Sequence, residues 1–401
     1  MRDLKHLILF EDLLQDAHNA LVSQAKEEGK IALGYTCSYI PEVLLNLQGC
    51  FGVRLRAPRS GAPNIATYYL TNRNCPFTSC ILERAIEGGY NFLNALMGSE
   101  TCAAMDRAQE HFERLNLVEN DKFFTTHLDA PLKNDADSIK FYKSQLILKV
   151  LNPIHDTYGI DISEKALLDA IKRHNEVCRI ITEIGNFRKD PNPVITGYEF
   201  HVINLISLCC PQHLVLEMLK ETLEELKTRE PDPNPPFKAR VVVVGSEIDD
   251  PEFTKLLEMC GALVVADRYC FGSFPGRDTI ELLDGESAMD AIARHYLDNN
   301  ECPRFMNHQK VNGRRNYIKK LFEEFHADGV IFEAMKFCEY WGFERTLASH
   351  ILTNEMDIPC CSIERDYTIS SSGQLRTRFQ AFVESLEIKK IIKNKEKSVN
   401  E

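Results

Sequence analysis

Ala239-Arg-Val-Val-Val-Val-Gly245 is an almost entirely apolar stretch of the kind that forms a strand buried on both faces of a parallel sheet. A helix is expected next, over residues 251–259, and a second strand over 262–266. The chain continues this alternation with strands expected at 329–333 and 358–364, a helix at 343–353 and a closing helix at 375–388. Strand, helix and strand in this order predict a doubly wound α/β unit.

The segment before this unit is expected to be helical. Between residues 137 and 226 apolar side chains recur every three or four positions, the spacing of one helix face. Prolines crowd residues 230–236, and proline blocks the continuation of a helix, so we expect a hinge and a boundary near Pro235. The predicted domains are an N-terminal α/β unit, a helical linker segment, a C-terminal α/β unit and a flexible tail, over residues 1–136, 137–236, 237–392 and 393–401.

The N-terminal part shows the same alternation. Strands are expected at 31–35, 52–56 and 67–71, a helix at 41–49 and a mostly helical segment at 77–97, with the unit ending near 123–128. Pro76 occupies a favourable first position for the second of these helices. The predicted fold class is therefore α/β, with two doubly wound Rossmann-like or flavodoxin-like parallel-sheet units joined by a helical segment.

The composition is typical of a globular protein with reduced thiols. Its 14 cysteines are scattered over 401 residues, whereas a secreted disulfide scaffold is short and dense in cysteine. The N-terminus lacks the apolar region of a signal peptide, and no stretch has the length needed to cross a bilayer, so we expect a cytoplasmic protein. The net charge of -12, without a dense basic block, argues against a nucleic-acid partner.

Three cysteines lie where loops at the carboxyl ends of parallel strands are expected. Cys75, Cys102 and Cys338 each precede a predicted helix or follow a predicted strand. Such loops form the ligand crevice of open parallel sheets, so a single soft-metal or iron–sulfur site between the two units is a reasonable interpretation. Any one of these thiols would more often be a buried apolar side chain, and Cys80, five residues beyond Cys75 in the next helix, competes for the same role.

Eight short motifs, taken in their order and spacing along the chain, resemble those of the subunits of 2-hydroxyacyl-CoA dehydratases and benzoyl-CoA reductases. The resemblance covers nearly the whole chain. It is carried by Gly34-Tyr-Thr-Cys-Ser-Tyr-Ile-Pro-Glu42, Cys75-Pro-Phe, Thr101-Cys102, Val264-Val-Ala-Asp-Arg-Tyr-Cys270-Phe-Gly, Cys302-Pro-Arg, Lys336-Phe-Cys338, Ile358-Pro and Gly373-Gln-Leu-Arg-Thr-Arg378.

The resemblance implies a subunit that carries a 4Fe-4S cluster on Cys75, Cys102 and Cys338. It also implies a homologous second subunit in a homodimer or heterodimer, an acyl-CoA substrate, and an ATP-hydrolysing 4Fe-4S activator protein that supplies single electrons. The implied reaction is that of a hydro-lyase, in which a ketyl radical forms from a 2-hydroxyacyl-CoA and loses the hydroxyl to give an enoyl-CoA.

Two other functions remain open within the resemblance. One is an ATP-dependent reductase of the benzoyl-CoA type or with a double-cubane cluster, for which Cys37, Cys80 and Cys270 offer spare ligands. The other is a non-catalytic subunit that relays electrons, which is suggested by Val43 and Ala103 at positions where the family tends to have acidic residues.

Ser38 and Glu42 are the polar candidates for a catalytic role near the expected site. The Ser38 hydroxyl could donate to a thioester oxygen, or it could cap the helix that begins near Pro41. Glu42 could exchange a proton if it is buried, because burial raises the pKa of a carboxyl group, or it could simply favour the positive end of that helix.

Overall fold

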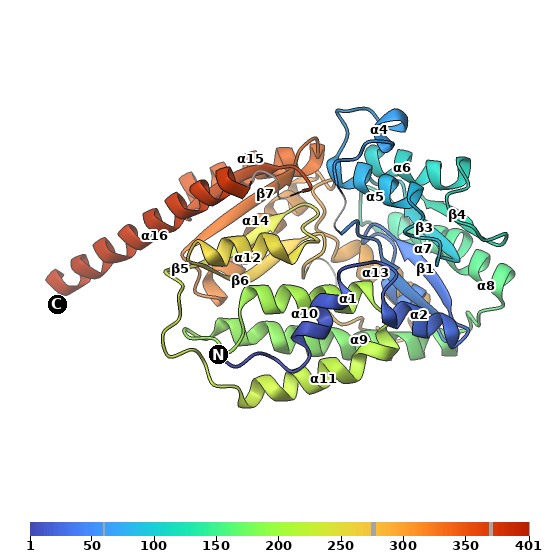
Figure 1. The fold of residues 1–401 in the computed structure, drawn as a ribbon, viewed down its shortest axis with the longest axis horizontal. Coiled ribbons are helices and arrows are strands. Elements are labelled where there is room, and N and C mark those ends of the chain that lie inside the picture. The colour runs from blue at the N-terminus through green and yellow to red at the C-terminus, as the bar shows by residue number, and fades with distance from the viewer. Residues whose placement is uncertain (59–60, 274–277, 369–371, 401) are drawn as a thin grey trace.

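Two four-stranded parallel sheets of the same strand order form the framework of the chain (Figure 1). The structure is a computed structural model that describes residues 1–58, 61–273, 278–368 and 372–400. The first sheet has the order β2-β1-β3-β4 and consists of β1 (Ile31–Tyr35), β2 (Cys50–Arg54), β3 (Ala95–Ser99) and β4 (Phe124–Leu128). The second has the order β6-β5-β7-β8 and consists of β5 (Ala239–Gly245), β6 (Ala262–Tyr269), β7 (Gly329–Met335) and β8 (Cys360–Arg365). The predicted α/β fold class is confirmed.

The central strands are apolar because helices cover both faces of each sheet. All residues of β5, β6 and β7 are buried, as the valine-rich stretch predicts. In register, Val241 of β5 lies beside Val264 on one side and Gly329 on the other. The strand order places each chain reversal between the two central strands, β1 and β3 or β5 and β7, as in flavodoxin-like sheets.

The helices of the first half precede, connect and flank its strands. They are α1 (Leu7–Leu13), α2 (Ala20–Glu27), α3 (Glu42–Leu45), α4 (Ala66–Tyr69), α5 (Pro76–Ile86) and α6 (Ala103–Arg114). The second half contains α12 (Pro251–Met259), α13 (Ala288–Asp298), α14 (His308–Glu324), α15 (Glu339–Glu355) and α16 (Ser372–Asn400). α16 extends away from the rest of the chain, and it continues through residues 393–400 of the predicted tail (Figure 1).

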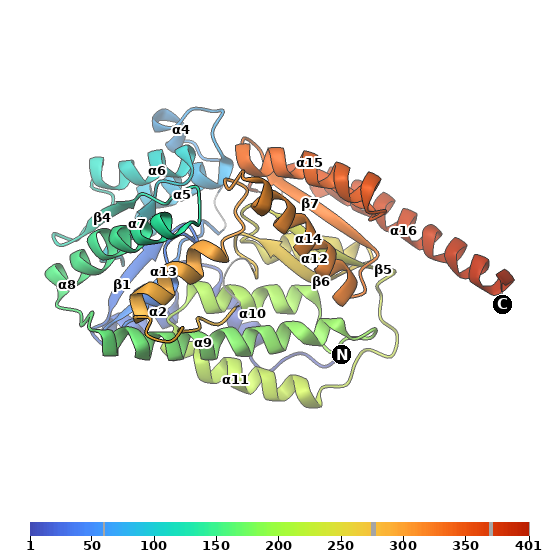
Figure 2. The same cartoon turned by 180° about the vertical axis from the view of Figure 1, so that it is seen from behind.

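The segment between the sheets is helical, as predicted. It comprises α7 (Ala136–Leu146), a π-helical turn (Ile147–Leu151), α8 (Asn152–Tyr158), α9 (Glu164–Asn186), a 3-10 turn (Phe187–Lys189), α10 (Gly197–Cys209) and α11 (Gln212–Thr228). α9, α10 and α11 run beneath both sheets (Figure 2). α10 is buried almost all round and contacts β2 as well as β6, so it joins the two sheets.

The second half also reaches back to the first through α13, which packs against α7 and α9 (Figure 2). Three polar contacts hold it there. Asp290 pairs with Lys143 at 2.7 Å, and the Ala288 amide donates to Glu164 at 2.7 Å. At the far end, Asn134 donates to Asp298 at 3.0 Å. The two halves are therefore interlocked by a helix as well as by a shared layer.

Two predictions for the first half were wrong. Residues 67–71 do not form a strand; instead α4 forms there because the Glu83 carboxylate accepts from the Ile65 and Ala66 amides at 3.2 and 2.7 Å and thereby caps a helical turn. The helix expected to reach residue 97 ends at Ile86, because Gly88 takes a left-handed backbone with a φ of 77°. β3 follows at Ala95–Ser99 and becomes a central strand.

Candidate functional site

The predicted site residues lie at the carboxyl ends of the strands, where the two sheets meet. Arg54, the last residue of β2, donates to the Cys270 carbonyl at 2.6 Å just beyond β6. Its guanidinium lies 3.8 Å from Glu247 and stacks 4.1 Å from the centre of the Phe271 ring. Because these partners belong to the second sheet, the ends of the sheets are joined by buried charged contacts.

Cys75, Cys102 and Cys338 occupy equivalent positions, since each is the residue that caps the N-terminus of a helix. They precede α5, α6 and α15 respectively. The positive end of each helix dipole therefore points toward a sulfur, an arrangement that favours a thiolate. Two of these helices follow strands of the first sheet and one follows a strand of the second.

The structure brings these three thiols together. Burial raises the pKa of Cys75 to about 12, while the Thr78 and Phe77 amides act in the opposite direction. The Cys75 pKa is raised further by Cys102. Burial also raises the Cys338 pKa, and both Cys75 and Cys102 add to the increase. The three groups are therefore close enough for their charges to interact.

Cys80 is placed differently. It is buried in the core on α5, and burial raises its pKa to about 12. The charged neighbours that affect it are Asp249 and Glu83, and no thiol is among them. Cys75 therefore interacts electrostatically with Cys102 and Cys338, whereas Cys80 interacts with carboxylates.

A second group of thiols adjoins the first and was only partly anticipated by the sequence. Burial raises the pKa of Cys270 and that of Cys302, and Cys37 contributes to the increase in both. Burial is also the main reason for the raised Cys102 pKa, and Cys37 adds to this increase. Arg304 and Arg314 lie near Cys302 and oppose the increase there. Six thiols from both halves therefore line one region.

The clustered thiols suit an iron–sulfur cluster rather than a single metal ion. Within the described ranges, no three His, Cys, Asp or Glu side chains converge closely enough to bind one metal ion. An iron–sulfur cluster imposes a different requirement, because each thiolate binds a different iron. Cys75 is buried and Cys102 and Cys338 are partly buried, and three such thiols at helix N-termini fit this cluster in chemistry.

The turn that carries Cys338 has an unusual backbone. Phe337 has a φ of 60°, a left-handed conformation that is rare for an aromatic residue, and its side chain is 51% exposed. The Cys338 amide donates to the Met335 carbonyl at 3.1 Å, which closes the turn. Strain of this type occurs preferentially at functional sites.

Ser38 and Glu42 lie in the loop after β1 and at the start of α3. Both are buried. The helix cap is Pro41, so Ser38 does not cap α3, and no hydrogen bond of its hydroxyl is found among the described residues. Glu42 accepts from the Tyr35 hydroxyl at 3.2 Å and lies 3.3 Å from His174 of α9. Burial alone would lower the His174 pKa, but Cys178 and Glu42 raise it to about 10.

Sequence reasoning missed the acidic groups that follow β5. Burial raises the Glu247 pKa to about 7, partly offset by Arg54, and Glu247 in turn acts on Cys75 and Cys270. Asp249 accepts from the Tyr367 hydroxyl at 2.6 Å. The available signal was a Glu-Ile-Asp-Asp run directly after a buried strand, which marks the same crevice edge.

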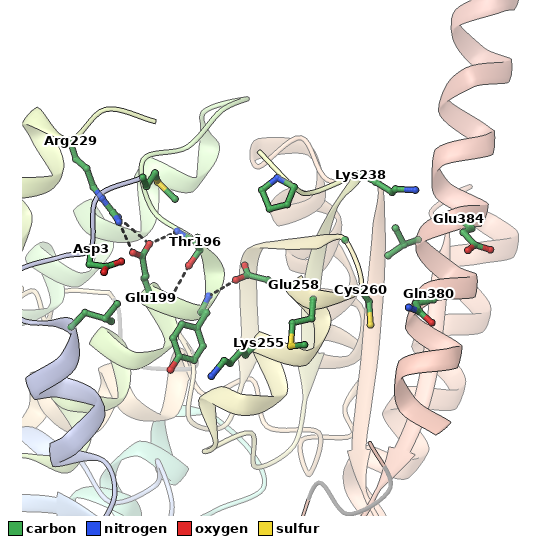
Figure 3. A pocket seen from close by; sticks show the side chains of 17 residues that line it. Asp3, Thr196, Glu199, Arg229, Lys238, Lys255, Glu258, Cys260, Gln380 and Glu384 are labelled. Atoms are coloured by element: carbon green, nitrogen blue, oxygen red, sulfur yellow. Dashed lines mark hydrogen bonds and ion pairs between the residues drawn. The ribbon is translucent and has the colours of Figure 1, made fainter. Parts of the chain in front are cut away.

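A pocket of about 760 Å³ lies away from the clustered thiols, between the N-terminal segment, α10, α12 and α16 (Figure 3). Two of its charged groups, Arg229 and Glu258, have close partners within the lining. Arg229 pairs with Glu199 at 2.7 Å, and Glu258 accepts from the Gly197 and Tyr198 amides at 2.7 and 3.2 Å. None of the six clustered thiols lines it, so we do not assign the cysteine chemistry to this pocket.

A family model described as 2-hydroxyglutaryl-CoA dehydratase, D-component, matches residues 37–386, which include all six clustered cysteines. The chain belongs to this family. The family resemblance inferred from the motifs is thereby confirmed. Within the described ranges, no helix is long and apolar enough to span a membrane.

Three similar proteins align with this chain over almost their entire length. It is 25% identical over 378 residues to the (R)-phenyllactyl-CoA dehydratase beta subunit of Clostridium sporogenes, which covers 94% of this chain and 97% of that protein. It is 24% identical over 380 residues to the lactoyl-CoA dehydratase subunit beta of Anaerotignum propionicum, with 94% and 97% covered. A putative dehydratase subunit of Escherichia coli (strain K12), YjiM, is 23% identical over 390 residues, with 91% and 94% covered.

Proposed function

We propose that this chain is the iron–sulfur subunit of a 2-hydroxyacyl-CoA dehydratase, with a 4Fe-4S cluster held by Cys75, Cys102 and Cys338. The observation that carries the proposal is the grouping of three buried or partly buried thiols, each at a helix N-terminus and drawn from both halves, in a chain of this family. When bound, the cluster supplies single electrons for the removal of water from a 2-hydroxyacyl-CoA.

The side chains of this chain would bind and orient the substrate. Ser38 is proposed to donate a hydrogen bond to the thioester oxygen, since its hydroxyl has no other partner among the described residues. Glu42 is proposed to exchange a proton, and its contacts with Tyr35 and His174 hold the loop after β1 in place. The buried surroundings exclude water, which strengthens each of these polar contacts.

The relatives named as beta subunits support a second, homologous subunit as partner. The electron donor proposed is an ATP-hydrolysing 4Fe-4S activator protein. Both partners, and an acyl-CoA as substrate, follow from the proposed reaction.

The decisive experiment is the measurement of iron and acid-labile sulfide in anaerobically purified protein, together with an EPR spectrum after reduction. The proposal expects about four of each per chain, the content of one cubane cluster. Cys102→Ser and Cys338→Ser should lose the iron. Absence of iron after anaerobic reconstitution, or full iron in both variants, would refute it.

A second candidate function is favoured by the additional thiols Cys37, Cys270 and Cys302. An ATP-dependent reductase with two linked clusters would use both groups as ligands. In that case about eight irons per chain are expected, and Cys270→Ser should remove about half of them. Reduction of an acceptor without loss of water would then replace the dehydratase reaction.

A further inference from the structure

A small cavity at the opposite edge of the first sheet has a lining without any acidic side chain. It has a volume of about 210 Å³ and lies where β1 and β2 begin, whereas the clustered thiols lie where the strands end. Lys30 precedes β1, Cys50 opens β2, Arg173 comes from α9, and Gln212 and His213 come from the first turn of α11. In a chain with a net charge of -12, such a lining requires an explanation.

The two cations of this cavity have no acidic partner. Neither Lys30 nor Arg173 forms an ion pair within the part of the chain that the structure describes. Arg173 uses one nitrogen to donate to the Asn46 carbonyl at 2.9 Å, and this contact fixes the guanidinium beside the cavity. In the larger pocket of Figure 3, by contrast, Arg229 is paired with Glu199. Lys30 and Arg173 therefore keep their positive charge without a direct ion pair, and Glu28 outside the lining acts on Lys30 only at longer range.

The polar group opposite these cations is also unsatisfied. Gln212 is only 7% exposed and lines the cavity, yet its side chain forms no hydrogen bond among the described residues. It stands at the first position of a helix of 17 residues whose capping residue, Pro211, provides no side-chain acceptor. Amides at a helix N-terminus favour an anion, and here a buried carboxamide and two cations point to the same place.

The titratable groups around the cavity agree with an anionic occupant. Burial lowers the His213 pKa, Lys30 and Arg173 lower it further, and Glu28, 3.0 Å from His213 at the rim, acts in the opposite direction. Burial raises the Cys50 pKa to about 12, so this thiol carries no charge near neutral pH. Glu28 is thus the acidic group that faces His213, and it lies outside the lining.

We propose that this cavity binds a phosphate group. The Arg173 guanidinium, the Lys30 ammonium and the Gln212 amide come from three different segments of the cavity wall and are all hydrogen-bond donors, which suits the several oxygens of a phosphate. The volume accommodates one phosphate together with the first atoms of an ester. The phosphate can come from inorganic phosphate or from a phosphorylated cofactor such as ADP or coenzyme A.

The test is isothermal titration of the full chain with inorganic phosphate, ADP and coenzyme A at constant ionic strength. The wild-type chain is expected to bind at least one of them, and the source of the phosphate is the ligand whose binding the cavity variants weaken, because coenzyme A can also bind at the proposed substrate site. In Lys30→Gln/Arg173→Gln the dissociation constant should rise at least tenfold. Lys172→Gln, an exposed change on the next position of α9 whose partner is Asp169, serves as the matched control and should bind normally.

Two further measurements keep the test independent of folding and of the cysteines. Gln212→Glu places a carboxylate in the cavity without removing a cation, so this variant should no longer bind the anion. In the wild type, the NMR titration of His213 should show a raised pKa when the anion is bound. The iron content of all variants should equal that of the wild type, so failure here leaves the proposed function untouched. Absence of binding by all three ligands, or equal binding by the wild type and both cavity variants, would overturn the proposal.

Discussion

The first strands of the two sheets are followed by a hydroxyl residue in the same position, but the partners of these hydroxyls differ. Thr36 follows β1 and accepts from Gln109 of α6 at 2.6 Å. Ser246 follows β5 and donates to the Glu333 carboxylate of β7 at 2.8 Å, and Glu333 also lies 2.8 Å from Arg365. The first half thus closes its switch point with a neutral contact and the second half with a buried ion pair.

Each of these contacts needs a glycine beside it. A Cβ atom at Gly98 would lie 2.2 Å from the Gln109 side-chain oxygen, and one at Gly245 would lie 2.6 Å from a Glu333 oxygen. The next residue differs as well, since Cys37 follows Thr36 whereas Glu247 follows Ser246. The residue after the switch-point hydroxyl is therefore a thiol in the first half and a carboxylate in the second.

The largest expected effect tests whether both halves are needed for the metal group. Cys102→Ser in the first half and Cys338→Ser in the second should each remove essentially all iron from anaerobically purified protein, because each is proposed as one of three ligands. Iron analysis beside circular dichroism measures this loss. Cys80→Ser is the control and should keep its iron; if it loses as much as the other two, the assignment of Cys75 is wrong.

The next effect compares the two closing contacts. Glu333→Ala should lower the free energy of unfolding by about 3–5 kcal/mol, because it leaves the buried Arg365 without its partner. Gln109→Ala should cost only about 1–3 kcal/mol, since it removes a neutral hydrogen bond. Denaturant titrations of both variants decide the matter, with Glu364→Ala, an exposed partner of Arg345, as a control near zero. Equal costs for the first two would erase the proposed difference.

The free energy of unfolding should depend on pH through Glu247, a buried carboxyl group of the second half. Burial raises its pKa from 4.5 to about 7, so the folded state binds this proton more tightly than the unfolded state. Stability should therefore fall as the pH rises from about 4.5 to 7, by up to about 3 kcal/mol, and then stay level. Glu247→Gln removes the titrating group, so the difference in unfolding free energy between variant and wild type should change across this range. A difference that is constant with pH would contradict the raised pKa.

The smallest effect concerns α16, which extends away from the second sheet and has no counterpart in the first. Removal of residues 391–401 should change the free energy of unfolding by less than about 0.5 kcal/mol, because Ile391 and Ile392 are exposed. Thermal unfolding of the truncated chain measures this. A loss comparable with that of Glu333→Ala would mean that the helix end is covered in solution.

Long apolar strands and well-marked helix starts could be predicted from the sequence. Residues 31–35 and 251–259 form a strand and a helix with the predicted bounds. β3 was missed because Ala-Leu-Met-Gly-Ser has no period that distinguishes a strand from the end of a helix. The helical turn of α4 could not be predicted, because its cap comes from Glu83, a residue of the following helix.

The candidate site could be predicted only where topology brings residues together. Cys102 follows β3 and Cys338 follows β7, which are central strands of different sheets, so the expected topology places each thiol at the carboxyl edge of its own sheet. The role of Glu42 as a partner of His174 was not predictable, because α9 lies far along the chain. The same holds for Glu247 and Arg54, whose contact requires the two sheets to face each other.

The return of α13 to the first half affects how the chain is made on the ribosome. While residues 1–280 emerge, the faces of α7 and α9 that α13 later covers stay exposed to solvent. The apolar residues that will cover them include Met289, Ile292 and Leu297. Because nascent chains with uncovered apolar surface aggregate, this surface is a natural place for a chaperone to bind. Completion of the first half thus waits for the synthesis of the second.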